Sequence, residues 1–312
     1  IIPPWINKFY ILDLRPDNSF IKWAVDQGFT VFVISWVNPD ETLAEMDFED
    51  YLAHGTLAAL DAIEKATGER EVNSVGYCIG GTLQFCTLGY MAAKRDKRIR
   101  SATAFTTMLD FTKVGEISVF IDEEQFAHID KGMEKRGFLE GYHMGGVFTL
   151  MRANDLIWSF VIRNYLLGQE PFPFDLLYWN ADPTRMPKAM HTFYLRNMYL
   201  NNRLKDPGGV SFLGQPIDLG KIKTPVFFLS TKDDHIAPWK YTYAGTRLPS
   251  GPVKFVLGES GHIAGVINAP TPKNKYGYWT NDKLAATPDE WFENAQAHKG
   301  SWWPHWLEWI KP

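Results

Sequence analysis

The sequence predicts a three-layer α/β fold, in which helices cover both faces of a mostly parallel sheet and a cap subdomain is inserted. Three observations support this prediction. Short, continuous apolar runs alternate with segments of helical periodicity, as in successive strand–helix–strand units. The runs have the length and composition of strands buried on both faces. A long aromatic-rich stretch then interrupts the alternation, which resumes beyond it.

The first half of the chain contains the clearest alternation. Ser19 has the residue type of a helix N-cap, and Gly28 and Gly68 occur where helices are expected to stop. The predicted elements are, in order, a helix over Ser19–Gly28, a strand over Thr30–Trp36 buried on both faces, a helix over Phe48–Thr67, a strand over Glu71–Tyr77, a helix over Ile79–Ala93 and a strand over Ser101–Thr107.

The alternation breaks near Asp110. We expect a core segment over residues 1–109, a cap or lid insertion over 110–222 and a second core segment over 223–312. Buried strands are predicted again at Pro225–Ser230 and Val253–Leu257. The tail contains four tryptophans at helical spacing, which predicts a helix packed on the body: Trp302, Trp303, Trp306 and Trp309.

Composition excludes several classes of protein. A net charge of −4 argues against nucleic-acid binding, and no apolar run approaches the roughly 20 residues of a membrane span. Two cysteines exclude a disulfide scaffold, and no His, Cys or carboxylate grouping has metal-ligand spacing, so no cofactor is expected. There is no secretory signal and no dinucleotide fingerprint. Because the chain begins at Ile1 and not at Met, we expect it to be the catalytic part of a longer protein.

The segment Gly76-Tyr-Cys-Ile-Gly-Gly81 has the strand–turn–helix context of a nucleophile elbow, with cysteine where serine is usual. Glycines allow the strand and the helix to approach each other, and the helix N-terminus favours a thiolate at Cys78. The backbone N–H of Ile79 is the expected oxyanion donor. Cys86 is expected to be a small core residue.

A cysteine nucleophile needs a base and a group that orients the base. Asp233 and Asp234 both follow a predicted strand, and Asp234 is preferred because of its register with Ile236-Ala-Pro238. His262 follows the next strand and is the expected base, with His235 as a rival. The order Cys78, Asp234, His262 is that of α/β hydrolases.

Several long motifs resemble those of polyhydroxyalkanoate synthases, which polymerise 3-hydroxyacyl-CoA thioesters. The resemblance covers nearly the whole chain. The motifs are Pro3-Pro-Trp-Ile-Asn-Lys-Phe-Tyr-Ile-Leu-Asp13, the Cys78 box, Asn154-Asp-Leu-Ile-Trp158, Phe174-Asp-Leu-Leu-Tyr-Trp-Asn180, Asp234-His-Ile-Ala-Pro-Trp239, Gly261-His-Ile-Ala-Gly-Val-Ile-Asn268 and Gly300-Ser-Trp-Trp-Pro304.

The resemblance implies an α/β-hydrolase core under a mobile cap, with a separate N-terminal region. It also implies a cytoplasmic homodimer at the surface of polymer granules, of the class I enzymes that use short monomers such as 3-hydroxybutyryl-CoA. Cys78 resembles the acylated cysteine of that family, and His262 resembles the base that deprotonates this cysteine. Asp234 resembles the aspartate that acts with the histidine or activates the incoming 3-hydroxyl.

The mechanism so implied needs further groups. A second oxyanion donor must come from Trp5, Ile6 or Asn7, because Pro3 and Pro4 carry no N–H, and Ile6 is preferred. The phosphates of CoA need cations, and Arg196 is preferred by the resemblance over three others: Arg203, Lys273 and Lys275. A cysteine-dependent thioesterase or depolymerase on the same fold is the first alternative, and a non-catalytic granule-binding protein is the second.

Overall fold

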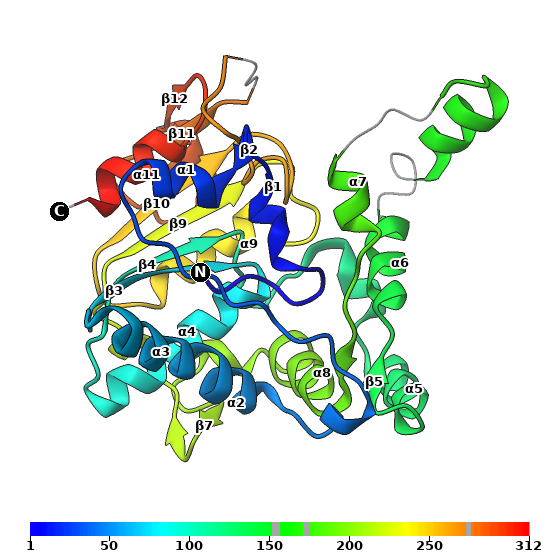
Figure 1. Cartoon of the computed structure of the whole chain (residues 1–312), viewed down its shortest axis with the longest axis horizontal. Helices are drawn as coiled ribbons and strands as arrows, with labels where there is room; N and C mark the ends of the chain where they lie inside the picture. Colours follow the sequence, from blue (N-terminus) through cyan, green and yellow to red (C-terminus); the bar gives the residue numbers. More distant parts are fainter. Residues whose placement is uncertain (152–156, 171–174, 273–275, 312) are drawn as a thin grey trace.

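The computed structural model describes residues 1–151, 157–170, 175–272 and 276–311, and its centre is a six-stranded sheet (Figure 1). The strand order is β12-β11-β10-β9-β4-β3, in which the four neighbours β10, β9, β4 and β3 run parallel and β11 and β12 are antiparallel. The bounds are β3 (Val72–Tyr77), β4 (Ile99–Phe105), β9 (Val226–Thr231), β10 (Val253–Gly258), β11 (Tyr278–Thr280) and β12 (Gln296–His298). The predicted mostly parallel sheet is confirmed.

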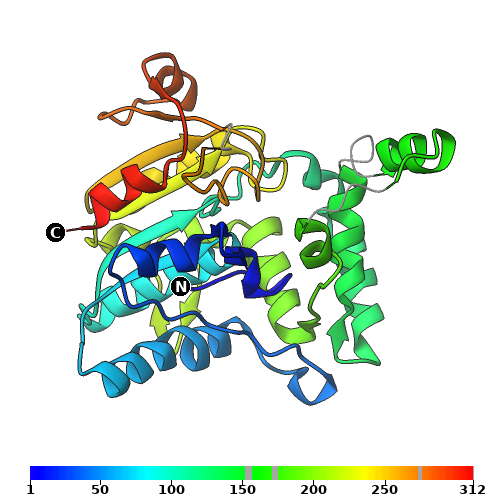
Figure 2. The ribbon, with the colours of Figure 1, turned by 45° about the horizontal axis from the view of Figure 1, so that its top comes forward.

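Helices cover both faces of this sheet (Figures 1 and 2). Every residue of β9 is buried, and its neighbours Phe227 and Phe228 belong to different hydrophobic clusters, one on each face. The cluster with Phe228 includes α4, and the cluster with Phe227 includes α1 and α11. The helices are α1 (Phe20–Asp26), α2 (Phe48–Asp50), α3 (Ala58–Thr67), α4 (Ile79–Lys94), α9 (Trp239–Ala244), α10 (Pro288–Glu293) and α11 (Trp303–Ile310).

The predicted helix boundaries are largely confirmed. The Ser19 side chain caps α1 by accepting a hydrogen bond from the Lys22 N–H at 2.8 Å. Gly68 ends α3 with φ +78°, a conformation that costs glycine little. The helix predicted as continuous over Phe48–Thr67 contains a π-helical stretch, Tyr51–Leu57, between α2 and α3.

The prediction that Thr30–Trp36 is a strand buried on both faces is wrong. No strand forms there, and the side chains of Thr30 and Phe32 are exposed. The segment is extended and hydrogen-bonds on one side only, through Ile1 N–H to Phe32 O (2.7 Å) and Ile34 N–H to Ile1 O (3.1 Å). Ile2 in turn bridges to Gly76 at the edge of β3. An apolar run becomes a buried strand only where neighbours lie on both sides, and among the described residues this run has one.

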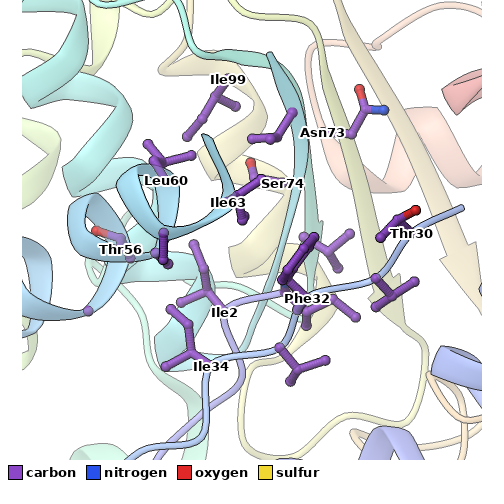
Figure 3. Close-up of a pocket in the computed structure, with 18 of the residues that line it drawn as sticks. Ile2, Thr30, Phe32, Ile34, Thr56, Leu60, Ile63, Asn73, Ser74 and Ile99 are labelled. Carbon is purple, nitrogen blue, oxygen red and sulfur yellow. The ribbon is translucent and has the colours of Figure 1, made fainter. Parts of the chain in front are cut away.

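An apolar pocket of about 760 Å³ lies beside this segment, far from the carboxyl ends of the strands (Figure 3). Phe32 and Ile34 line it together with Ile2 and with residues of α3 and β3. Its lining includes none of the three predicted catalytic residues, Cys78, Asp234 and His262.

The segment between β4 and β9, where the sequence predicts a cap, is called the cap below, and its helices between residues 123 and 180 stand to one side of the core in Figure 1. The return from the cap packs on the core, because the small hairpin β7–β8 and the turn η9 contact α4. The elements between β4 and β9 are η4 (Gly115–Phe120), α5 (Glu123–Glu134), β5 (Phe138–Leu139), α6 (Gly141–Met151), η6 (Val161–Leu166), α7 (Asp175–Asn180), β6 (Met186–Pro187), α8 (Lys188–Tyr194), η7 (Leu195–Leu200), η8 (Arg203–Lys205), β7 (Ser211–Phe212), β8 (Gln215–Pro216) and η9 (Leu219–Lys221).

The remaining short elements flank the core. They are η1 (Phe9–Leu12), β1 (Asp13–Arg15), β2 (Asn18–Ser19), η2 (Glu41–Leu43), η3 (Tyr51–Leu57) and η10 (Gly245–Arg247). Among the described residues, no helix combines the length and the apolar character needed to cross a bilayer.

Candidate active site

Cys78 occupies a sharp turn between β3 and α4. Its backbone has φ +54° and ψ −125°, a region that costs a non-glycine residue energy and is found chiefly at functional turns. Tyr77 ends β3 and Ile79 begins α4, so the turn consists of this one residue. Cys78 is partly exposed, whereas Cys86 is buried in the core as predicted. The geometry is that of the predicted nucleophile elbow.

The glycines around Cys78 are required by close packing. A Cβ at Gly76 would collide with the backbone of Gly81, and a Cβ at Gly81 would collide with the Thr107 side chain. A Cβ at Gly80 would collide with the carbonyl of Ile2, because residues 2 and 3 cross directly over the first turn of α4. Glycine is therefore the residue that lets the strand, the helix and the N-terminal segment meet here.

Asp234 and His262 form a buried pair at the carboxyl ends of β9 and β10. His262 Nδ1 lies 2.7 Å from Asp234 Oδ2, and the two side chains are 6% and 0% exposed. The other carboxylate oxygen, Oδ1, accepts hydrogen bonds from the N–H groups of Ile236 and Ala237, each at 2.8 Å. Two backbone donors fix the carboxylate, and the carboxylate fixes the imidazole. This is the geometry expected of an aspartate that orients His262, and this role of Asp234 stays a prediction.

The competing candidates occupy other positions. Asp233 is exposed, while Asp234 is buried, so the preference for Asp234 is consistent with the geometry. His235 is partly buried and follows Asp234 directly in the chain, whereas His262 is the histidine that meets the Asp234 carboxylate.

Tyr77 joins the two halves of the site, a role that the motif analysis missed. Its hydroxyl donates a hydrogen bond to the His262 carbonyl at 2.9 Å, and its ring stacks on the imidazole with centroids 5.6 Å apart. Tyr77 directly precedes Cys78 in the chain, so the same residue helps to hold both Cys78 and His262 in position. The only signal in the sequence was an aromatic residue inside the Gly-x-Cys-x-Gly motif.

The C-terminal tryptophans hold the loop that carries His262. The indole N–H of Trp302 donates to Gly265 O at 2.8 Å, and that of Trp303 donates to Val266 O at 3.0 Å. Both side chains are fully buried, and Trp306 is buried with them. The predicted packing of the tryptophan helix is confirmed, and its contacts show that it supports the catalytic loop.

The ionisation of His262 is shifted by two opposing effects. Burial, the largest effect, lowers the pKa of His262, whereas the Asp234 carboxylate and the adjacent Cys78 raise it, and the net result is a pKa of about 10. The protonated imidazole is therefore stabilised chiefly by the Asp234 carboxylate. This favours a proton held on His262 once it has left Cys78.

The two predicted oxyanion donors lie at the start of α4 and in the N-terminal segment. Ile79 is the first residue of α4, where backbone N–H groups are free of helical partners. The Ile6 carbonyl accepts the Thr184 N–H at 2.9 Å, which ties the N-terminal segment to the cap. The assignment of both N–H groups to an oxyanion stays a prediction.

Arg196 is already paired in this structure. Its guanidinium contacts the carboxylates of Glu123 and Asp130 on α5. An incoming phosphate would compete with two carboxylates, so a CoA contact at Arg196 stays a prediction that this pairing does not favour. Of the lesser candidates, Lys273 and Lys275 lie outside the described residues. Within the described part of the chain, no cluster of three or more His, Cys or carboxylate groups is placed to hold a metal.

Two tyrosines of the cap were also missed as site residues. Tyr194 ends α8 and Tyr199 lies in η7, and burial, with Cys78 as a further cause, raises the pKa of both side chains. Helical periodicity gave no signal for them, because η7 is a π-helix.

The fold and this elbow–acid–histidine arrangement define an α/β hydrolase, and the chain belongs to the α/β-hydrolase fold family, which matches residues 13–269. A second family, the N-terminus of poly-beta-hydroxybutyrate polymerase (PhaC), matches residues 1–24.

The chain is similar in sequence to several curated poly(3-hydroxyalkanoate) polymerases. The chain is 55% identical over 311 residues to the PhaC subunit of Rhizobium meliloti, covering 100% of this chain and 51% of that protein. It is 53% identical to the polymerase of Methylorubrum extorquens (100% and 51%) and 42% identical to the PhaC subunit of Cupriavidus necator (99% and 53%). The resemblance inferred from the motifs is confirmed. The chain spans about half the length of these curated relatives.

Proposed function

We propose that the protein polymerises (R)-3-hydroxyacyl-CoA, with 3-hydroxybutyryl-CoA as the favoured monomer, into polyhydroxyalkanoate with release of CoA. One observation carries the proposal: the nucleophile elbow holds a cysteine beside a buried Asp234–His262 pair, in a chain 55% identical to a named poly(3-hydroxyalkanoate) polymerase.

In the first half-reaction the proton of the Cys78 thiol is held on His262, whose raised pKa of about 10 favours this. The thiolate attacks the thioester carbonyl, and the oxyanion receives the N–H of Ile79, with Ile6 proposed as the second donor. The tetrahedral intermediate collapses, the CoA thiolate leaves and takes the proton from His262, and the acyl group remains on Cys78.

In the second half-reaction a 3-hydroxyl group attacks the acyl-cysteine. His262 accepts the hydroxyl proton, and Asp234 stabilises the imidazolium through the 2.7 Å contact. Collapse forms an ester, expels the Cys78 thiolate and returns the proton to it. A thioester is an appropriate intermediate because exchange with CoA is nearly balanced, so the acyl group stays reactive toward an alcohol.

The proposal also includes the oligomeric state of the protein and its binding to the polymer granule. We propose a cytoplasmic homodimer that works at the surface of the polyester granule, and the cap provides an apolar surface for such contacts. Tyr165 (85% exposed) and Leu166 (73%) lie in η6, and Tyr178 (76%) lies in α7, and such exposure is unusual for large apolar side chains. Granule pelleting and sedimentation of a Tyr165→Ser/Leu166→Ser variant test which contact this surface makes, and unchanged behaviour in both assays would argue against it.

The deciding experiment is mass spectrometry of the whole natural protein after addition of 3-hydroxybutyryl-CoA, with CoA and polymer assayed alongside. A mass increase of 3-hydroxybutyryl units on Cys78 together with polymer is the expected result. Release of CoA and free acid without polymer would identify a thioesterase that uses the same three residues. Absence of an adduct and of CoA release would point to a non-catalytic granule-binding protein.

A further inference from the structure

The N-terminal segment of residues 2–8 connects the nucleophile elbow with the cap. Ile2 pairs in parallel with the end of β3, and its carbonyl accepts the Tyr77 N–H at 3.1 Å. The same carbonyl lies over the first turn of α4, where it would collide with a Cβ on Gly80. The segment is therefore held against residues on either side of Cys78 before it continues toward the cap.

The position of this segment next to the nucleophile strand suits it to bind an oxyanion. In α/β hydrolases the second oxyanion donor is an N–H of the loop that follows a strand beside the nucleophile strand. Ile2 lies beside β3 in this way, so the corresponding loop begins at Pro3. Among the described residues, none accepts a hydrogen bond from the N–H of Ile6, which leaves this group available. An oxyanion donor acts through its fixed position, so the loop must be held in one conformation.

The cap holds this loop through α7 and the turn that follows it. The Trp179 indole N–H donates to Lys8 O at 2.7 Å, and the Thr184 N–H donates to Ile6 O at 2.9 Å. The Thr184 hydroxyl donates to Trp5 O. Both cap side chains are buried, so these hydrogen bonds are shielded from competing water.

Thr184 fixes the direction of the expected oxyanion donor. The Trp5 carbonyl, which the Thr184 hydroxyl binds, belongs to the same peptide unit as the Ile6 N–H. That unit is planar and trans, so the N–H points away from the carbonyl and therefore away from Thr184. A hydrogen bond to one edge of the peptide unit thus orients the donor on the opposite edge.

Asp182 strengthens the same contact on its more exposed side. Its Oδ1 lies 2.7 Å from the Lys8 ammonium, and its Oδ2 accepts the Tyr10 hydroxyl at 2.9 Å. The hydrogen bond from Lys8 is the largest effect on the pKa of Asp182 and lowers it, while burial and then this carboxylate raise the pKa of Tyr10 to about 12. The carboxylate is therefore ionised and the phenol protonated at physiological pH, as both hydrogen bonds require.

We propose that Asp182 and Thr184 are positioning residues, which hold the loop of residues 5–8 beside the nucleophile elbow so that its backbone receives the oxyanion. This inference deepens the proposed function and rests on it. Among the described residues, Thr184 is the one hydrogen-bond donor to the carbonyls of Trp5 and Ile6. The cap therefore takes part in catalysis through the backbone that it holds, and not only by covering the site.

The test compares a reaction that needs an oxyanion site with one that does not, on the whole natural protein. Single-turnover CoA release from 3-hydroxybutyryl-CoA measures acylation of Cys78, which passes through an oxyanion. Iodoacetamide alkylates the same thiolate by displacing iodide from a saturated carbon and forms no oxyanion. The variants are Thr184→Val and Asp182→Asn. The matched control is Asp26→Asn, because Asp26 forms an exposed ion pair with Lys22 within α1.

We expect acylation at saturating substrate to slow at least about tenfold in Thr184→Val and about threefold in Asp182→Asn. Loss of a whole oxyanion donor costs about 10²–10³-fold, and a displaced loop loses part of this. Alkylation of Cys78, followed by mass spectrometry, should stay within about twofold of the wild-type rate in both variants. The control Asp26→Asn should match the wild type in both reactions.

Equal losses in both reactions would overturn the inference, because they would mean a role in folding or in the reactivity of the thiol. Unchanged acylation in both variants would overturn it as well. A wild-type protein that is alkylated but never acylated would overturn it together with the proposed function. Failure of the polymerase proposal alone has a different signature: the wild type yields only free acid, while its acylation step still slows in both variants.

Discussion

Two histidines, one in the core and one in the cap, are almost equally buried, yet the pKa of the first is raised and the pKa of the second is lowered. His262 is 5% exposed and His191, in α8, is 2% exposed. The Asp234 carboxylate at 2.7 Å and Cys78 outweigh burial and raise the pKa of His262 to about 10. Among the described residues, none makes such a contact with His191 or hydrogen-bonds to its Nδ1, and burial lowers its pKa to about 4 against a weaker effect of Asp130. Burial alone makes a histidine neutral, and a fixed carboxylate makes it a base that can keep a proton.

The largest effect is expected from replacing Cys78, the proposed nucleophile whose proton His262 holds. Cys78→Ala should abolish acyl-enzyme formation and polymer, because no other group at the elbow can form the thioester. Cys78→Ser should fold and react poorly, since a serine hydroxyl is far harder to ionise. Mass spectrometry and CoA release measure both, and substantial polymer from Cys78→Ala would refute the assignment of the nucleophile.

Asp234→Asn should make the core histidine resemble the cap histidine. The amide keeps the shape but not the charge, so burial would dominate and the pKa of His262 would fall below its usual value. We expect kcat to drop by about 10³-fold or more, as in other triads that lose their carboxylate.

The same variant has a signature in the pH dependence of stability. In the wild type His262 contributes stability that is complete below pH 6.5 and is lost as the pH rises toward about 10, because the folded state binds the proton more tightly than the unfolded state. Urea unfolding between pH 6.5 and 10 should show this decline in the wild type and not in Asp234→Asn. An equal decline in both would show that another group causes it.

These core contacts were largely predictable, and the reason is local. The residues Cys78, Asp234 and His262 each follow a buried strand, and parallel strands end at the same edge of the sheet. The support from Tyr77 and Trp302 was not predictable, because these hydrogen bonds join residues 185 and 37 positions apart. The cap tyrosines were missed for another reason: a π-turn changes which side chains share a face.

The incorrect strand prediction at Thr30–Trp36 also shows that a local sequence pattern does not determine tertiary contacts. Its apolar run encodes a tendency to be buried, but burial depends on what lies next to it. Here Ile1 provides a hydrogen-bonded neighbour, and the segment lines the apolar pocket together with Ile1 and Ile2. Composition specified what the segment prefers, and tertiary contacts decided what it forms.

The cap histidine gives the next largest effect, on stability. Because the pKa of His191 is about 4 in the folded state, the unfolded chain takes up a proton between pH 6.5 and 4 that the folded chain refuses. Stability should therefore fall on acidification, by about 3 kcal/mol over this range from this residue alone. In His191→Phe that acid-side slope should be lost, measured by urea unfolding at pH 7, 5.5 and 4.5. A slope as steep as in the wild type would mean that His191 is not the group responsible.

The smallest effect is expected from the tryptophan support of the His262 loop. Trp302→Phe keeps an aromatic ring in the core but removes the N–H that binds Gly265 O, leaving a buried carbonyl without its partner. The free energy of unfolding should fall by about 1–3 kcal/mol. Trp309→Phe, in α11 and only partly buried, is the matched control for Trp302, the residue that directly precedes α11, and should change stability by less. If the loop only stabilises the fold, kcat of the folded variant will equal that of the control. If it positions the base, kcat will fall several-fold at unchanged KM, because the imidazole is held less firmly over Cys78 while the substrate still meets the same cap.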